Sequence, residues 1–318
     1  MVAEIFMIHE NPEWLPPFAA AFADRNARFI DWNMAYKHLD LWQIPPEGVF
    51  YNRMSASSHT RGHTYAPEHA KLVLAWLEAH GRRVLNGSQA LRLEVSKIEQ
   101  YLAFAQFSIE APKTTAALGA EEIITAAEDF ARDVGGDFIT KHNRAGKGLG
   151  VKLFENTDQL RAYVDGPEFD QSRDGVTLIQ QYIKSPEAFI TRAEFVGGKF
   201  QYAVRVDTSQ GFELCPADVC RIDDAPSAAD DRPMFEVLDS FDPLLIERYE
   251  ALMTANDIHV AAFESIIDAN GRAFTYDLNT NTNYNAEAEM AAGVSGMGAL
   301  AEFLGDELAQ AAALKDAA

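Results

Sequence analysis

A glycine-rich segment between two predicted strands is the feature that most limits what this chain can fold into. The segment KHNRAGKGLG, residues 141–150, contains three alternating glycines and two lysines: Gly146, Gly148, Gly150, Lys141 and Lys147. It is not a Walker A loop, because Lys147 is followed by glycine and no Ser or Thr stands ready for Mg²⁺. It is not a Rossmann fingerprint, because the VKLF that follows predicts a strand rather than a helix. The segment therefore caps a β-hairpin, either as an ordinary turn or as a loop that covers phosphate.

A second hairpin is predicted for residues 259–279, with its turn at Asn270 and Gly271. Pairing across that turn puts Glu264 opposite Asp277, and Asp277 shares a strand face with Asn279 because the two are two residues apart. Two carboxylates and a carboxamide are hard oxygen donors, which suit Mg²⁺ better than zinc or copper. The alternative is a solvated polar face on an edge strand, although the flanking residues are apolar.

The first hundred residues alternate between short apolar runs and helical patterns. Residues 4–8, 28–32, 48–52 and 82–86 predict strands, and residues 67–81 predict a helix. Such alternation indicates a small, mainly parallel sheet of the α/β class, in which ligands lie beyond the carboxyl ends of the strands. Arg53 directly follows one of these strands, so it is predicted either to bind an anionic substrate or to fix its own loop.

The remainder of the chain mixes helices with antiparallel strand patterns, as in α+β proteins. Residues 93–114 predict a helix, then a short strand, then a turn at Pro112. A helix is predicted at 120–134 and an apolar strand at 177–183, followed by two strands around a Gly197-Gly198 turn. The chain ends in an alanine-rich helical segment.

Composition excludes several classes of protein. The formal net charge of −21 argues against a nonspecific nucleic-acid binder, which needs a basic face. The chain has no run of about 18 apolar residues, so no membrane span is predicted. The start MVAEIFMIHE lacks the basic and apolar regions of a signal peptide, so a cytoplasmic location is predicted. Cys215 and Cys220 have no histidine nearby to complete a zinc site.

The order of these parts resembles the ATP-grasp carboxylate–amine ligases. That order is an α/β pre-grasp domain, a small lid with a lysine and a glycine loop, a hinge strand and a terminal metal hairpin. The resemblance is greatest to ligases that add glutamate to a protein C-terminus, the ribosomal-protein-modifying type, and includes glutathione synthetase and D-alanine–D-alanine ligase. It implies an ATP-grasp fold with domains at residues 1–95, 96–185 and 186–318.

The resemblance also implies a nucleotide site. Lys97 matches the first nucleotide-binding lysine and Lys141 the second, while the loop glycines match the part of the lid that closes over the β- and γ-phosphates. Arg192 and Arg205 match the basic residues after the hinge, and Arg205 with Lys141 is implied to act in catalysis. Taken without the resemblance, Lys97 is also compatible with a helix surface and Arg205 with a solvated strand. The adenine hinge matches Gln180, Gln181, Tyr182 and Ile183.

Two positions depart from the family pattern. Gln181 stands where the family often has glutamate, and Ile190 stands where it has an acid before the first arginine. The metal ligands are intact, since Glu264, Asp277 and Asn279 match positions that hold Mg²⁺, with Mn²⁺ as the alternative ion. Asn281 and Asn283, just past them, are predicted with Arg53 to contact the substrate.

The implied reaction is ATP-dependent peptide-bond formation through an acyl phosphate, with release of ADP and phosphate. The predicted substrate is an amino acid or a peptide, and related ligases suggest a homo-oligomer. Two alternatives stay open: a phosphotransferase or kinase that uses the same ATP site, and a catalytically inert nucleotide-binding regulator.

Overall fold

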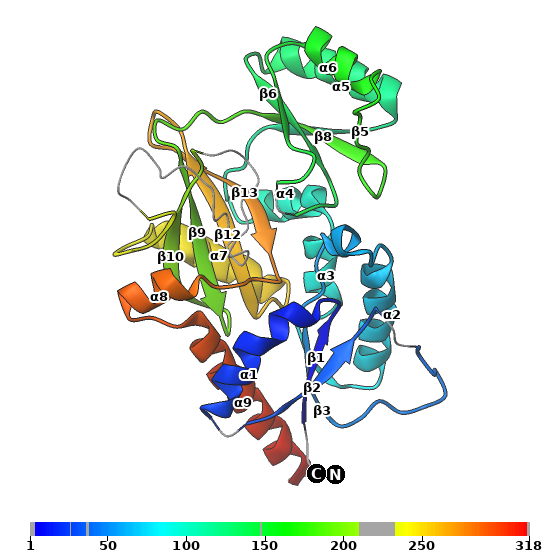
Figure 1. Ribbon diagram of the computed structural model, residues 1–318, viewed down its shortest axis with the longest axis vertical. Coiled ribbons are helices and arrows are strands. Elements are labelled where there is room, and N and C mark those ends of the chain that lie inside the picture. The colour runs from blue at the N-terminus through cyan, green and yellow to red at the C-terminus, as the bar shows by residue number, and fades with distance from the viewer. Residues whose placement is uncertain (1–3, 26, 36–37, 147, 210–232, 317–318) are drawn as a thin grey trace.

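Three separate sheets build the protein. The computed structural model describes residues 4–25, 27–35, 38–146, 148–209 and 233–316, so Lys147 and both cysteines lie outside the described residues. The N-terminal sheet is parallel, and the two that follow are antiparallel. Figure 1 shows the middle sheet with its helices above the other two. No helix in these ranges is long and apolar enough to cross a bilayer.

The N-terminal sheet has the order β2-β1-β3-β4 and is covered on both faces. Alternation along β1 directs Ile5 and Met7 to α1 and α9, and Phe6 and Ile8 to α2. The helix α9 thus returns from the end of the chain to pack beside α1 (Figure 1). The bounds are β1 (Glu4–His9), β2 (Phe29–Asn33), β3 (Gly48–Asn52), β4 (Arg83–Leu85), α1 (Leu15–Ala23), α2 (Ala66–Ala79), α9 (Gly296–Asp316), and the 3₁₀ turns η1 (Pro12–Trp14) and η2 (Ser58–Arg61).

The middle sheet, called the lid below together with its two helices, has the order β5-β8-β6-β7. Phe138, Phe154 and Ile179 face the helices α5 and α6, which leaves the other face of the sheet toward the rest of the protein. The pairing of β6 with β7 confirms the hairpin predicted around the glycine segment. The bounds are β5 (Thr114–Leu118), β6 (Phe138–His142), β7 (Lys152–Phe154), β8 (Val176–Gln181), α5 (Ala120–Asp133) and α6 (Thr157–Val164).

The C-terminal sheet has the order β11-β10-β9-β12-β13. One face carries Phe195 and Phe263, which pack on Tyr249 of α7, and Leu278, which joins the same core with residues of α4. The opposite face is left for polar side chains. The bounds are β9 (Phe189–Val196), β10 (Lys199–Asp207), β11 (Phe235–Leu238), β12 (Val260–Ile267), β13 (Ala273–Asn279), α3 (Ser88–Glu94), α4 (Lys97–Gln106), α7 (Pro243–Ala255) and α8 (Ala286–Ala292).

The structure corrects the prediction for residues 93–114. That segment contains the end of α3 and the whole of α4, which begins where the Ser96 hydroxyl accepts a hydrogen bond from the backbone of Glu99. No strand lies between α4 and Pro112, and β5 begins after it at Thr114. The predicted domain limits stay a proposal, and α9 packs against β1 and β3 of the N-terminal sheet.

Candidate active site

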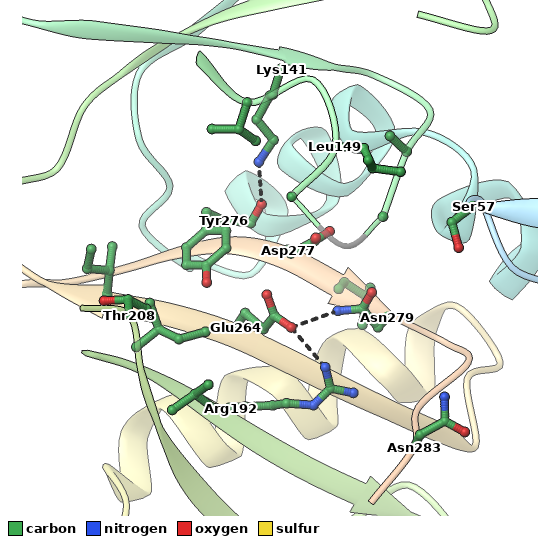
Figure 2. A pocket seen from close by; sticks show the side chains of 18 of the residues that line it. Ser57, Lys141, Leu149, Arg192, Thr208, Glu264, Tyr276, Asp277, Asn279 and Asn283 are labelled. Carbon is green, nitrogen blue, oxygen red and sulfur yellow. Dashed lines mark hydrogen bonds and ion pairs between the residues drawn. The ribbon is translucent and has the colours of Figure 1, made fainter. Parts of the chain in front are cut away.

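A cavity of about 1180 Å³ lies where the three sheets meet. Its wall combines loops that follow β1 and β3, the inner face of the lid, and the polar face of β9, β12 and β13 (Figure 2). Residues from distant parts of the sequence therefore meet in one space. Of the predicted site residues, the wall includes Lys97, Lys141, Gly146, Gly148, Gln180, Gln181, Tyr182, Ile183, Arg192, Glu264, Asp277, Asn279, Asn281 and Asn283.

Three predicted residues are not on this wall. Arg53 lies behind it, 1% exposed, and Gly150 lies against the ring of His142. Arg205 lies on the other face of the C-terminal sheet, where its guanidinium is 4.5 Å from the ring centroid of Phe189. We therefore do not retain the predicted contact of Arg205 with phosphate or its catalytic role.

The hairpin β12–β13 brings the predicted metal ligands together. Glu264 is the direct partner of Asp277, as predicted, although Ile267 and Ala273 next to the turn pair in a register that differs by one residue. A β-bulge at Tyr276 changes the register just beyond this pair and directs both Tyr276 and Asp277 into the cavity. The amide nitrogen of Asn279 donates to Oε1 of Glu264 at 3.3 Å, so all three predicted ligands lie side by side.

Each of the two carboxylates has a basic partner. The Lys97 ammonium is 2.6 Å from Oδ1 of Asp277, and the Arg192 guanidinium is 2.8 Å from Oε1 of Glu264. Burial disfavours the charged form of Asp277, but Lys97 and Lys141 hold its pKa below the usual range. Burial raises the pKa of Glu264 in spite of Arg192. A cation would oppose that rise by stabilising the charged carboxylate.

The donor set fits a hard divalent cation. Two carboxylates and one amide oxygen are the ligand types that Mg²⁺ and Mn²⁺ prefer. Within the described ranges no three His, Cys, Asp or Glu side chains are placed so that they could hold a metal together, which gives no support to a zinc-type centre. Asn279 supplies an amide as the third donor, so the predicted set is a pair of acids completed by an asparagine.

Arg192 is held in a buried network. Its guanidinium donates to Glu194 at 2.6 Å, to Glu264 at 2.8 Å and to the hydroxyl of Thr282 at 2.6 Å, and that hydroxyl donates to Glu194 at 2.7 Å. Glu194 therefore supplies the carboxylate that Ile190 lacks, two residues after the arginine instead of two residues before it. The network fixes Glu264 on the side away from Asp277.

Lys141 projects from β6 of the lid toward the carboxylates (Figure 2). Its ammonium donates to the backbone oxygen of Tyr276 at 3.2 Å and lies over the rings of Tyr101 and Tyr276, 5.7 and 5.4 Å from their centroids. Burial lowers the pKa of Lys141, although Asp277 and Glu264 favour the charged form. The described residues give this ammonium no ion pair, so its contacts are with neutral groups.

The glycine loop crosses from the lid to the N-terminal domain. A Cβ at Gly146 would lie 3.4 Å from Ser57, and one at Gly150 would lie 2.5 Å from Nε2 of His142. Gly148 and Gly150 both have φ of +73°, a conformation that side chains rarely adopt. Arg144 forms an ion pair with Glu68 of α2, so the loop is held over the cavity.

The end of β8 forms the wall on the lid side. The amide of Gln180 donates to the hydroxyls of Tyr101 and Thr114 at 2.9 and 2.8 Å, which fixes this strand end against α4 and β5. The backbone of Gln181 donates to Lys113 and that of Tyr182 to Asp137. Within the described ranges the backbone N–H of Ile183 has no such partner, which leaves a donor at the wall.

Several residues of the wall were not predicted. Glu94 is buried and accepts hydrogen bonds from the backbones of Ala56 and Thr280, at 3.1 and 2.7 Å, which ties the N-terminal domain to the segment after β13. Trp14 follows β1 at the carboxyl edge of the parallel sheet. A usable signal existed for Trp14, because ligands of such a sheet lie beyond the carboxyl ends of its strands, where the segment that contains Trp14 begins. The sequence around Glu94 has no pattern that would have indicated a place on the cavity wall.

The buried Glu94 predicts a pH dependence of stability. Burial raises its pKa from 4.5 to about 7, so its contribution is complete below pH 4.5 and is lost as the pH rises through 7. Without metal and nucleotide, we expect wild-type protein to lose about 3 kcal/mol relative to Glu94→Gln between about pH 4 and about pH 8. The free energies of unfolding of wild type and Glu94→Gln are measured at both pH values. If wild type differs from the variant by the same amount at both, the prediction is contradicted.

Substitution of a loop glycine is predicted to reduce turnover more than it reduces the stability of the fold. Gly148→Val forces a β-branched residue into a positive-φ position on the cavity wall, at a cost of about 1–3 kcal/mol. We expect kcat/KM for ATP to fall at least about tenfold. Gly135→Val is the matched control, because Gly135 also has a positive φ but lies in an open turn of the lid. Equal kinetics in both variants would make the loop a mere hairpin tip.

Comparison with known proteins identifies the fold. No protein-family model matches the chain, and no curated protein matches it. Solved structures do. The RimK domain protein ATP-grasp from Sphaerobacter thermophilus is 17% identical with a TM-score of 0.63, over 95% of this chain and 99% of that one. The ATP-grasp ligase PsnB complexed with minimal precursor is 14% identical with a TM-score of 0.66, over 96% and 99%.

A third similar structure is D-alanyl-alanine synthetase A from Vibrio cholerae, 14% identical with a TM-score of 0.61, over 97% of this chain and 99% of that one. At such low identity these likenesses establish the fold alone. The chain therefore has the ATP-grasp fold along nearly its whole length, as the order of its sequence motifs predicted.

Proposed function

We propose that this protein is an ATP-dependent carboxylate–amine ligase that acts on an amino acid or a peptide and releases ADP and phosphate. The observation that carries the proposal is the convergence of Lys97, Lys141, Glu264, Asp277 and Asn279 in one cavity of an ATP-grasp fold. Similar structures support it, since one of them is PsnB complexed with Mg and ADP.

The nucleotide is proposed to lie between the lid and the C-terminal sheet. Adenine would contact the end of β8, where the N–H of Ile183, which has no backbone partner among the described residues, offers a donor and apolar Ile139 and Leu278 line the wall. The phosphates would then extend toward Lys141 and the glycine loop. Backbone N–H groups of a glycine loop approach phosphate oxygens closely because no Cβ intervenes.

Glu264, Asp277 and Asn279 are proposed to hold Mg²⁺. The bound ion would screen the charge of phosphate oxygens and align the phosphoryl group for transfer. Lys97 and Arg192 fix the two carboxylates by ion pairs from opposite sides. The chain thus supplies a preformed polar face, and its cost of reorganisation during the reaction is small.

In the proposed reaction the substrate carboxylate attacks the γ-phosphate, which breaks the bond to ADP and gives an acyl phosphate. An amine then attacks the acyl carbon, and phosphate leaves with the electron pair of its bond to that carbon. Lys141 offsets negative charge at the phosphates, while the glycine loop excludes water that would hydrolyse the acyl phosphate. Positioning and charge therefore account for catalysis, and no side-chain nucleophile is required.

A screen for ADP release tests the proposal. Amino acids and short peptides are supplied as acids, singly and together with amines, in the presence of ATP and Mg²⁺. A ligase releases ADP only when acid and amine are both present. Release with a single phosphate acceptor and formation of a stable phosphorylated product would identify a phosphotransferase instead. Tight binding of Mg-ATP without turnover in any mixture would identify a nucleotide-binding regulator.

A further inference from the structure

Arg53 is a buried cation directly behind the cavity wall. One guanidinium nitrogen, Nη2, donates to the backbone oxygen of Thr282 at 2.8 Å and to Oδ1 of Asn283 at 2.7 Å. The guanidinium also lies over the rings of Trp14 and Phe18, 5.2 and 4.5 Å from their centroids. Arg53 does not reach the cavity, but Asn283 does. Any action of Arg53 on a bound molecule therefore passes through this amide.

The contact fixes which way the Asn283 amide points. An arginine side chain has only donors, so the atom that faces it must be the amide oxygen. The amide nitrogen is then directed away from Arg53, and Figure 2 shows it on the side of the cavity. The nitrogen carries two donors, and no described residue accepts from it. The cavity therefore presents a fixed hydrogen-bond donor at this point.

The charge behind the amide is not balanced locally. Arg61, the other arginine at this end of the cavity, pairs with the buried carboxylate of Glu10, and its guanidinium lies over the same Trp14 ring. Arg53 has no carboxylate partner among the described residues, and its bonds go to neutral oxygens. A buried cation without an anion is unfavourable, so an anion placed next to Asn283 would be stabilised by it.

We propose that Asn283 and Arg53 form the recognition site for a carboxylate of the substrate. The Asn283 nitrogen donates to the carboxylate, while Arg53 is a positioning residue that fixes and polarises the amide and supplies the positive charge. This rests on the proposed function, because it names the ligase substrate as an amino acid or peptide whose free carboxylate binds here. If the Asn283 nitrogen donated to a neutral carbonyl of the substrate instead, the charge of Arg53 would stay unbalanced.

Equilibrium binding tests the proposal without turnover. The probes are the twenty L-amino acids as free acids and as primary amides, added to protein with Mg-ADP, with binding read from thermal shift and then calorimetry. We expect at least one free acid to bind, and its amide to bind at least about tenfold more weakly. Failure of every acid to bind, or equal binding of acid and amide, overturns the proposal.

Two variants place the effect on this pair of residues. Arg53→Met removes the charge and should weaken binding of that acid about tenfold or more, with the affinity for ATP nearly unchanged. Asn283→Asp keeps a partner for Arg53, and adds an ion pair, but replaces the donor with an acceptor. It should therefore melt no lower than wild type and yet lose the acid. Asn283→Asp keeps Arg53 in place, so its folding does not depend on whether the protein tolerates the loss of that arginine. If this variant still binds the acid as wild type does, the proposal is wrong.

The same measurements separate this proposal from the ligase assignment. Binding of the acid by wild type, lost in Asn283→Asp, supports the carboxylate site even if no mixture releases ADP. If an acid and an amine together release ADP, but both variants bind that acid as wild type does, the ligase assignment is supported and the carboxylate site is rejected.

Discussion

Asp277→Asn is expected to reduce ADP formation by about 10³-fold, which corresponds to about 4 kcal/mol of transition-state stabilisation. Asp277 lies opposite Glu264, beside Asn279, and its carboxylate is kept charged by Lys97 and Lys141. The substitution removes that charge from the proposed metal site but leaves an amide oxygen for the Lys97 ammonium. The loss should therefore appear in catalysis and in the Mg²⁺ requirement more than in the fold.

The measurement is the rate of ADP formation as a function of Mg²⁺ concentration, with melting temperature as the check on folding. Asp268→Asn is the matched control, because Asp268 lies in the turn of the same hairpin and accepts hydrogen bonds from Asn270 and Arg272. We expect it to retain activity within about twofold. If Asp277→Asn forms ADP at the wild-type rate with saturating Mg²⁺, the metal assignment fails.

The pairing of Glu264 with Asp277 was predicted, but the turn does not produce it. Next to the turn Ile267 pairs with Ala273, and that register alone would put Glu264 opposite Tyr276. Asn270 and Gly271 lie midway between Glu264 and Asp277, and these two are paired in the structure. The bulge at Tyr276 was not predictable from alternation, since a bulge adds one residue without a distinct pattern. It shifts the register by one residue, so that Asp277 becomes the partner of Glu264, and it brings Tyr276 into the cavity.

A bulge also determines where Arg205 lies, a residue that the resemblance alone assigned to the site. Pairing outward from the Gly197-Gly198 turn begins with Val196 opposite Lys199, and an unbroken register would put Arg205 on the same face as Arg192. The register shifts by one residue between Phe200 and Tyr202, so every later side chain of β10 turns to the opposite face. Arg205 then contacts Phe189 on the far side from the cavity.

The break between α3 and α4 did have a local signal. Ser96 and Glu99 are three residues apart, the spacing of a capping box, and in the structure the Ser96 hydroxyl caps α4. The apolar residues on either side continue a helical pattern, which concealed the break. The cap has a functional consequence, because α4 begins at Lys97 and its first residue thereby reaches Asp277.

Other contacts of the site depend on long-range packing. Arg53 meets Asn283, 230 positions away along the chain, and Glu94 meets Thr280, 186 positions away. No local period or propensity encodes such distances. The sequence limited Arg53 to binding a substrate or fixing its loop, whereas the structure shows it bonded to Thr282 and Asn283 in the segment after β13. Its link to a substrate through Asn283 is the proposal made above.

Lys141→Met is expected to lower the affinity for ATP about 100-fold while the nucleotide-free protein melts at the same temperature or higher. The ammonium is buried against neutral partners, namely the Tyr276 carbonyl and two tyrosine rings, so burial of its charge opposes folding. Methionine fills a similar volume without that charge. A phosphate oxygen would give the ammonium its missing anion, and loss of such a charge-assisted bond costs about 1.5–3 kcal/mol.

Opposite signs in stability and affinity distinguish a phosphate-binding lysine from a structural one. Lys152→Met is the matched control in the same lid, because the Lys152 ammonium also lies over a tyrosine ring, that of Tyr163 at 4.9 Å, but is exposed on β7. Lys152→Met should leave the affinity for ATP unchanged.

Burial lowers the pKa of Lys141, so the affinity of wild type for ATP should fall at a lower pH than it would if the lysine were exposed. Lys141→Met should lack that fall. Calorimetric titration with Mg-ATP across alkaline pH measures both effects. A Lys141→Met protein that melts lower and binds ATP normally would assign Lys141 to the structure of the lid and move the phosphate site toward Lys97.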